Sequence, residues 1–215
     1  MKLISVNIGL PREIDWHGKI VTTGIYKEPV AGPVLLQNLN LEGDKQADLA
    51  AHGGVNKAVY AYPSEHYEFW RNELPGLSLP FGIFGENLTI EGLSEENVNI
   101  GERFRIGEAE VMVTEPRMPC YKLNIRFGRP DMVNWFAASG RARFYLAVTR
   151  EGTLQAGDSI TRFKDRASGI TVADVTRLHL FEKDDLKMLQ RALQIEALPE
   201  AWRDKFRQQH KKYAG

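Results

Sequence analysis

The hydrophobic positions between Met1 and about Phe163 fall in short runs rich in β-branched and aromatic residues, separated by Gly, Pro, Asn and Asp. Runs of this kind predict β-strands. The predicted strands are residues 1–9, 18–26, 34–41, 57–63, 86–92, 103–107, 109–116, 143–152 and 158–163. Short strands at this spacing are typical of a closed or nearly closed barrel.

Helical patterns interrupt the strands at three places. Residues 64–74 predict a helix that Ser64 caps, and residues 130–140 predict one that begins at Pro130 and ends at Gly140. A further short helical turn is expected after Cys120, because Leu123 and Phe127 lie four residues apart and would share a face.

The pattern changes after about Lys164. A polar linker, residues 164–169, is followed by helical patterns over 170–180, 184–194 and 198–213. Thr171 with Asp174 three residues later predicts a capping box at the start of the first helix. We therefore expect a barrel domain over residues 1–163 and a small three-helix domain over residues 164–215.

Composition and charge limit the classes of protein to which this chain can belong. The chain has 215 residues and a formal net charge of zero, which argues against a stable nucleic-acid interface. It has no apolar run of about 18 residues, and its start lacks a signal-peptide pattern. A single cysteine excludes an internal disulfide and an all-cysteine metal site. These features predict a cytoplasmic protein without membrane association.

The single cysteine, Cys120, has two interpretations. It is either a small buried hydrophobic residue or a reactive thiolate. Arg117 and Lys122 would favour the thiolate, and Pro116 and Pro119 would stiffen the chain on the approach to the thiol. Sequence chemistry alone leaves both interpretations open.

Two glycine-rich segments are weaker candidates. His52-Gly53-Gly54-Val55-Asn56-Lys57 is either an ordinary turn or an anion-binding loop with Lys57 as a point charge. Asn87 and Thr89 follow a second such segment, residues 80–86, and are either strand residues or part of a binding loop. Asp44, Gln46 and Asp48 alternate as calcium ligands do, but the required Gly and Glu are absent, so we reject a calcium loop.

Three blocks in combination are more specific than any one of them. LEGDKQAD, HGGVNKAVYAY and residues 84–123 occur in this order and resemble the MOSC domain family, the molybdenum-cofactor sulfurase C-terminal family. The resemblance extends from about residue 35 to residue 130. Within the family the chain looks most like the YiiM group, which is linked to 6-hydroxylaminopurine resistance and carries three helices after the barrel.

The resemblance implies a mainly β fold with α-helices: a predominantly antiparallel β-barrel with peripheral helices, then the three-helix domain. It implies a molybdopterin-type molybdenum cofactor with Cys120 as the protein ligand of molybdenum and the catalytic residue. A soft thiolate suits such a metal. The residues that match the family's cofactor-binding blocks are His52, Gly53, Gly54, Asn56, Lys57, Asn87, Thr89, Arg117, Tyr121 and Lys122.

The activity that the resemblance implies is reduction of small N-hydroxylated compounds, namely hydroxylaminopurines, hydroxylamines and amidoximes. The chain has no spare cysteines, no CxxCH haem site and no GxGxxG after a strand, so electrons would come from a separate redox protein. A persulfide sulfur carrier that uses Cys120 and a non-catalytic cofactor-binding module remain as alternatives. A buried, inert Cys120 is a third.

Overall fold

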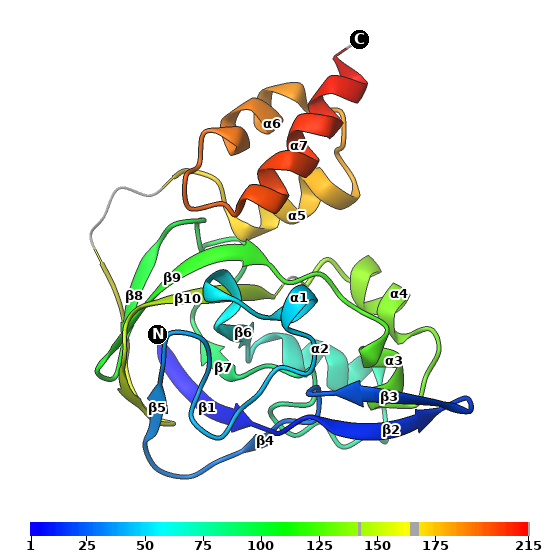
Figure 1. The fold of residues 1–215 in the computed structure, drawn as a ribbon, viewed down its shortest axis with the longest axis vertical. Coiled ribbons are helices and arrows are strands. Elements are labelled where there is room, and N and C mark those ends of the chain that lie inside the picture. Colours follow the sequence, from blue (N-terminus) through cyan, green and yellow to red (C-terminus); the bar gives the residue numbers. More distant parts are fainter. Residues whose placement is uncertain (142, 164–167, 215) are drawn as a thin grey trace.

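The computed structural model describes residues 1–141, 143–163 and 168–214. A strongly curved β-structure forms the lower part of the molecule, and three helices at the C-terminal end cover its upper side (Figure 1). The main sheet consists of β1 (Lys2–Ile8), β4 (Glu28–Pro29), β6 (Val59–Pro63), β7 (Leu88–Glu91), β8 (Arg103–Ile106), β9 (Ala109–Pro116), β10 (Phe144–Arg150) and β12 (Ile160–Arg162). Two smaller pairs are β2 (Arg12–Trp16) with β3 (Lys19–Thr23), and β5 (Val34–Leu36) with β11 (Gly152–Leu154).

The helices are short and lie around the sheet. In the barrel part they are α1 (Leu49–His52), the 3-10 helix η1 (Val55–Lys57), α2 (His66–Glu73), α3 (Lys122–Phe127) and α4 (Met132–Ala138). In the C-terminal part they are α5 (Val172–Leu180), α6 (Leu186–Leu193) and α7 (Glu200–Tyr213). None of the helices in the described ranges is both long and apolar enough to cross a membrane.

The main sheet runs in the order β12-β8-β9-β10-β6-β7-β1-β4 and is antiparallel except for β6 with β7. The segment that leads into β12 meets β1, the strand before the last, but not through a regular strand pair. A single bridge joins Lys2 to Ser159, and the Leu3 N–H donates to the Asp158 carbonyl at 2.9 Å. The fold is therefore the expected antiparallel barrel type, nearly closed rather than closed.

A one-residue bulge interrupts the pairing of β9 with β10. Tyr145 pairs with Glu115 and Leu146 pairs with Val113, so Thr114 has no partner in the ladder. The Thr114 hydroxyl instead donates to the carbonyls of Asn56, at 2.6 Å, and Tyr145, at 3.1 Å. Side chains alternate between the two faces of a strand, so the extra residue moves Glu115 out of the apolar core to the side on which Tyr145 lies.

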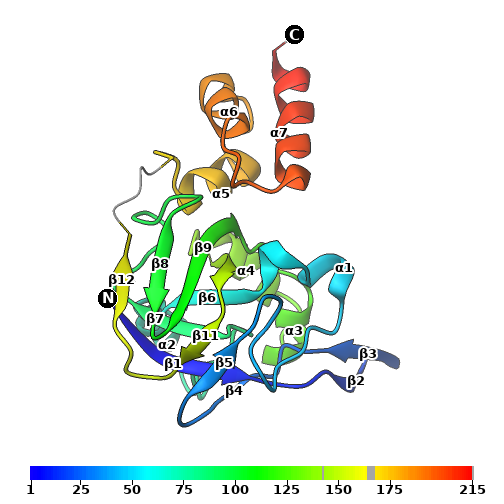
Figure 2. The same ribbon diagram turned by 60° about the vertical axis from the view of Figure 1, so that its left-hand side comes forward.

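Two apolar clusters stabilise the fold. The larger one fills the barrel and continues without a break into the C-terminal helices through Val175, Leu178 and Trp202. The smaller one lies outside the sheet under α2, α3 and α4, and includes Tyr62, Trp70, Phe84, Leu123, Phe136 and Tyr145. The barrel and the helices therefore bury one shared core, and Figure 2 shows α5 lying directly on the end of the barrel.

Most predicted elements are present. Leu123 is fully buried and Phe127 packs beside it in the smaller cluster, as their spacing predicted. The Thr171–Asp174 capping box is formed, with both hydrogen bonds in place. The predicted linker falls largely on residues 164–167, which lie outside the described residues.

Other expectations were wrong or incomplete. Ser64 does not cap α2, which begins without a side-chain cap. β2, β4 and β11 were not predicted. β2 and β3 form a ribbon with a His17–Gly18 turn in which both residues have positive φ, and its largely exposed faces leave no hydrophobic alternation to detect.

The cap geometry predicts two different mutational effects. Thr171→Ala should lower the free energy of unfolding by about 1 kcal/mol, because the Asp174 N–H loses its acceptor. Thr171→Ser keeps the hydroxyl and should stay near wild type. Ser64→Ala should change stability little, because the Ser64 side chain accepts no cap hydrogen bond. Thermal or urea unfolding of the full chain measures all three. A loss of stability in Ser64→Ala as large as that in Thr171→Ala would contradict this description.

Candidate functional site

Cys120 lies in the segment between β9 and α3 and is half-buried. The segment is anchored at both ends. The Arg117 N–H donates to the Arg143 carbonyl at 2.8 Å, which continues the β9–β10 pairing, and the Leu123 N–H donates to the Cys120 carbonyl at 3.0 Å. The chain therefore turns tightly after the cysteine and folds the backbone N–H of Lys122 back towards the thiol.

The surroundings of Cys120 favour the thiolate. Burial alone raises the pKa of the thiol, but hydrogen bonding from His52, the Arg117 charge and the Lys122 backbone N–H outweigh it. Together they lower the pKa of Cys120 from 9.0 to about 6. Of the two interpretations of the cysteine, the structure supports the reactive one.

His52 is held in place by Tyr145. The Tyr145 hydroxyl and His52 Nδ1 are 3.3 Å apart. When Nδ1 accepts this hydroxyl, the proton of the neutral ring is on Nε2, and the histidine remains a hydrogen-bond donor. The Arg117 guanidinium lies 5.7 Å from the Tyr145 ring centroid and 4.9 Å from that of Tyr60, so aromatic faces hold the positively charged partner of the thiol.

A cavity of about 60 Å³ opens beside these groups. It is lined by Gly24, Ile25, Lys27, Asp44, Lys45, Gln46, Ala47, His52, Lys57, Tyr60, Gly85, Asn87, Arg117, Lys122 and Tyr145. His52 and Arg117 belong both to this wall and to the surroundings of Cys120, so the thiol lies at the edge of the cavity. The lining has five cationic side chains and one carboxylate, an arrangement that favours an anionic ligand.

The one carboxylate in the wall is neutralised by a buried ion pair. Asp44 and Lys27 form a direct contact, with side-chain exposures of 1% and 7%. Asp44 also accepts from the Gly9 N–H and from Asn87 Nδ2, both at 2.9 Å. A buried pair needs such additional hydrogen bonds to offset its desolvation. Asp44 therefore ties three distant segments together under the cavity.

Asn87 lines the cavity, but its polar atoms already bind protein. Its side-chain oxygen accepts from the Tyr60 N–H at 3.2 Å, and its amide donates to Asp44 and to the Asn7 carbonyl at 3.3 Å. Thr89 is fully buried and bonds Asn7 and Glu86 at 3.1 and 3.0 Å. Both residues support the wall from behind.

The His52–Lys57 segment brings its two ends to the cavity. Gly53 closes α1 by donating to the Leu49 carbonyl, and the Lys57 N–H donates to the Gly54 carbonyl at 2.9 Å. Gly54 has a φ of 93°, which favours glycine at this turn. His52 and Lys57 line the cavity, whereas Gly53, Gly54 and Asn56 do not.

Of the remaining residues predicted to bind the cofactor, some line the cavity and others do not. Arg117 and Lys122 lie in the wall. Tyr121 is 52% exposed and does not belong to the cavity lining. The structure thus brings His52, Lys57, Asn87, Arg117 and Lys122 together around the cavity and leaves the other predicted cofactor-binding residues outside the lining.

Several site residues were not singled out from the sequence. They are Lys27, Tyr60 and Tyr145, which line the cavity, and Arg143, which lies behind Tyr60 outside the lining. Arg143 is fully buried, and its guanidinium has no hydrogen-bond acceptor among the described residues. It packs on Phe136, 4.0 Å from the ring centroid, and near Tyr60 at 5.4 Å. An arginine directly before the apolar run 144–148 was the available signal.

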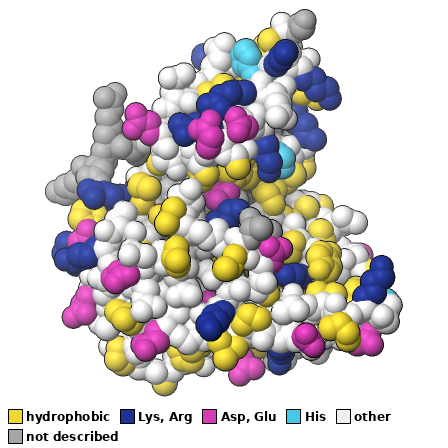
Figure 3. Space-filling view, in the orientation of Figure 1, with side chains coloured by type: hydrophobic (Ala, Val, Ile, Leu, Met, Phe, Trp, Pro, Cys, Tyr) yellow, Lys and Arg dark blue, Asp and Glu magenta, His cyan; other side chains and the backbone are white. Residues whose placement is uncertain are grey.

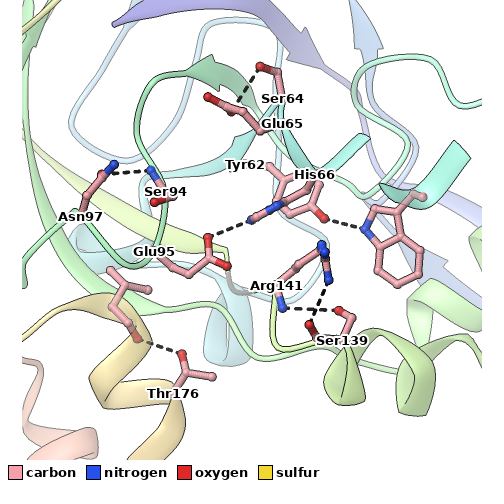
Figure 4. Close-up of polar contacts among 12 residues, drawn as sticks. Tyr62, Ser64, Glu65, His66, Ser94, Glu95, Asn97, Ser139, Arg141 and Thr176 are labelled. Atoms are coloured by element: carbon pink, nitrogen blue, oxygen red, sulfur yellow. Dashed lines mark hydrogen bonds and ion pairs between the residues drawn. The ribbon is translucent and has the colours of Figure 1, made fainter. Parts of the chain in front are cut away.

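Other polar side chains in the described part of the chain are spread over the surface or tie elements together. The face seen in Figure 3 carries basic and acidic side chains interspersed, in line with the zero net charge. Figure 4 shows a second polar cluster, in which His66 Nε2 lies 2.8 Å from Glu95 and the Trp70 indole donates to the Tyr62 hydroxyl at 2.7 Å. These contacts tie α2 to the barrel. No group of three or more His, Cys, Asp and Glu residues in the described part could hold a metal alone.

Comparison with known families identifies both parts of the chain. The MOSC domain model matches residues 48–161, and the model described as the YiiM-like, 3-alpha helix domain matches residues 170–209.

Individual proteins agree with these two matches. YflK of Bacillus subtilis is 42% identical over 95% of this chain and 92% of its own length. YiiM of Escherichia coli is 36% identical over 84% and 81%. A Gibberella moniliformis protein named reductase is 33% identical over 90% of this chain, which corresponds to 35% of that longer protein. The crystal structure of YiiM from Geobacillus stearothermophilus superposes with a TM-score of 0.81 at 29% identity, covering 97% of this chain and 98% of the other.

The surroundings of Cys120 predict an unusual pH profile for thiol alkylation. In the wild type, the rate should rise with pH and level off with a midpoint at about 6, because the thiolate is the reacting form. His52→Ala should move the midpoint upward, since a hydrogen bond to the sulfur is lost. Lys122→Ala is the matched control and should move it less, because Lys122 acts on the thiol through its backbone N–H. A wild-type midpoint near 9.0, the ordinary value, would contradict this account of the site.

Proposed function

Because the chain belongs to the MOSC domain family and carries a YiiM-like three-helix domain, we propose that it is a molybdenum-cofactor-dependent reductase of N-hydroxylated compounds. Its substrates would be small molecules such as hydroxylaminopurines, hydroxylamines and amidoximes. The observation that carries the proposal is Cys120: a half-buried thiol with a pKa of about 6, at the edge of a cavity with a cationic lining.

The residues present fit a molybdopterin-type cofactor. MOSC domains are associated with this cofactor in general, and a thiolate is a suitable protein ligand for a soft metal site. Because the described part has no group of side chains that could hold a metal alone, the other ligands would arrive with the cofactor. Lys45, Lys57 and Lys122 line the cavity and would bind the cofactor's phosphate.

The bound cofactor would supply the redox chemistry, in which two electrons and two protons convert an N-hydroxyl group to an amine and water. The chain's own residues have simpler roles. Cys120 would bind the metal as a thiolate, and Arg117 and His52 would keep it ionised.

Electrons would come from a separate redox protein. One cysteine cannot ligate an iron–sulfur cluster, and the chain has no haem-attachment or dinucleotide-binding motif. The relative named reductase supports an oxidoreductase, and the matched region is 35% of that protein. The rest of that longer protein is large enough to contain an electron-transfer domain of its own. In this chain, a separate partner protein would supply the electrons.

A thiol with a low pKa also suits a persulfide carrier, in which Cys120 would hold a sulfur atom for transfer. The two functions differ in what the purified protein contains. A carrier would show a persulfide on Cys120 without metal, and a cofactor-binding module without catalysis would hold the metal but turn over nothing.

The proposal predicts a specific activity. Protein from a host that makes the cofactor should convert a hydroxylaminopurine to the aminopurine when a reduced viologen dye donates electrons. Cys120→Ser should lose this activity while keeping the wild-type unfolding temperature, because the thiol is half-buried and the substitution is small. Product formation by chromatography measures both. Absence of turnover in protein that contains the metal would contradict the reductase and support a binding module.

A further inference from the structure

Glu115 is a buried carboxylate at the end of β9, and it faces two parts of the protein at once. It is 5% exposed, and the bulge at Thr114 places it on the side of the sheet where Tyr145 lies. Its Oε1 lies 3.8 Å from Lys57 Nζ, in the wall of the cavity. Its Oε2 accepts a hydrogen bond from the indole N–H of Trp202, on α7 of the three-helix domain.

Trp202 is held firmly by the helices around it. It is 3% exposed, and its ring lies 5.1 Å from His179 of α5 and 5.7 Å from Phe206 of α7, measured between ring centroids. The Lys205 ammonium lies 4.9 Å from the same ring. The position of the indole N–H therefore depends on the packing of α5 against α7 and not on the barrel alone.

We propose that Glu115 is a positioning residue that couples the three-helix domain to the cavity: Trp202 fixes its carboxylate, and the carboxylate fixes the Lys57 ammonium at the cavity wall. The coupling is a property of the chain without cofactor. Its relevance to catalysis rests on the proposed function, in which Lys57 binds the cofactor's phosphate.

The coupling matters because holding a lysine side chain in one position costs conformational entropy. A lysine side chain loses rotamer freedom when it is held in one geometry, and a free lysine beside a cavity would sample many positions. The Glu115 side chain is 7% exposed and the Lys57 side chain 25% exposed, so the carboxylate restrains the ammonium more than it would at a fully exposed site, because charge interactions weaken in water. The carboxylate must itself be held, and an indole N–H donates well to it.

The charge of Glu115 depends on the same partners. Burial raises the pKa of Glu115, while Lys57, the Trp202 hydrogen bond and Lys205 oppose that effect. Tyr145 is the titratable group that faces it from β10. Without the indole N–H, the carboxylate would protonate more readily and its hold on Lys57 would weaken.

The test is the acylation rate of Lys57 in the full-length chain without cofactor, at one fixed neutral pH, followed by peptide mass spectrometry. Glu115→Gln keeps an acceptor for Trp202 but removes the negative charge, so Lys57 should react faster. Trp202→Phe should increase the rate in the same direction by a smaller factor. Lys45 and Lys122 also line the cavity and serve as internal controls in each sample, since their rates report any general opening.

Phe206→Leu is the matched control variant. Phe206 is fully buried on the same helix as Trp202, so this change loosens α7 without removing the indole N–H. Because the Phe206 ring packs on Trp202 but does not donate to Glu115, the substitution should raise the Lys57 rate, relative to Lys45, by less than Trp202→Phe does. Equal increases in Trp202→Phe and Phe206→Leu, or no increase in Trp202→Phe, would overturn the coupling.

If Trp202→Phe does not fold, the acylation rate of Lys57 in Glu115→Gln still tests the proposal. An unchanged Lys57 rate in Glu115→Gln overturns the proposal regardless of the tail variants. All these measurements are made on metal-free protein, so their outcome is independent of whether the chain is a molybdenum reductase.

Discussion

The one-residue bulge at Thr114 is the constraint on which the site depends. A regular β9 strand would direct Glu115 into the barrel core together with Val111 and Val113, where an unpaired carboxylate would be costly. The bulge reverses the alternation for the last residues of the strand. As a result, Glu115 meets Lys57 and Trp202, and β9 ends where Arg117 and Cys120 can turn towards the cavity.

The cavity is lined by several positively charged side chains and only one carboxylate. Lys27 is matched by Asp44 inside the wall, whereas Arg117 beside the thiol is held by the faces of aromatic rings. Such an arrangement leaves positive potential in a region of low dielectric, where it acts strongly on a nearby anion. The thiolate of Cys120 is one such anion, and an anionic cofactor would be another.

The sequence alone predicted those features that depend only on residues close together along the chain. The capping box at Thr171 and the family blocks that contain His52, Lys57 and Cys120 are read directly from neighbouring residues. It did not predict those features that depend on how strands far apart in the sequence pair with each other. The bulge depends on a partner strand about 30 residues away, and Tyr145 reads only as a strand residue until β10 pairs with β9. The Ser64 cap failed because Glu65, the residue before α2, has a helical conformation, and the Tyr67 N–H donates to the Ser64 carbonyl and not to its hydroxyl.

The most direct measurement is the molybdenum content of protein purified from a host that makes the cofactor, with wild type and Cys120→Ser prepared in parallel. We expect near-stoichiometric molybdenum in the wild type and its loss in the variant, because Cys120 would be the protein ligand of the metal under the proposed function. Molybdenum absent from both, or retained equally in Cys120→Ser, would contradict the central role assigned to this thiol.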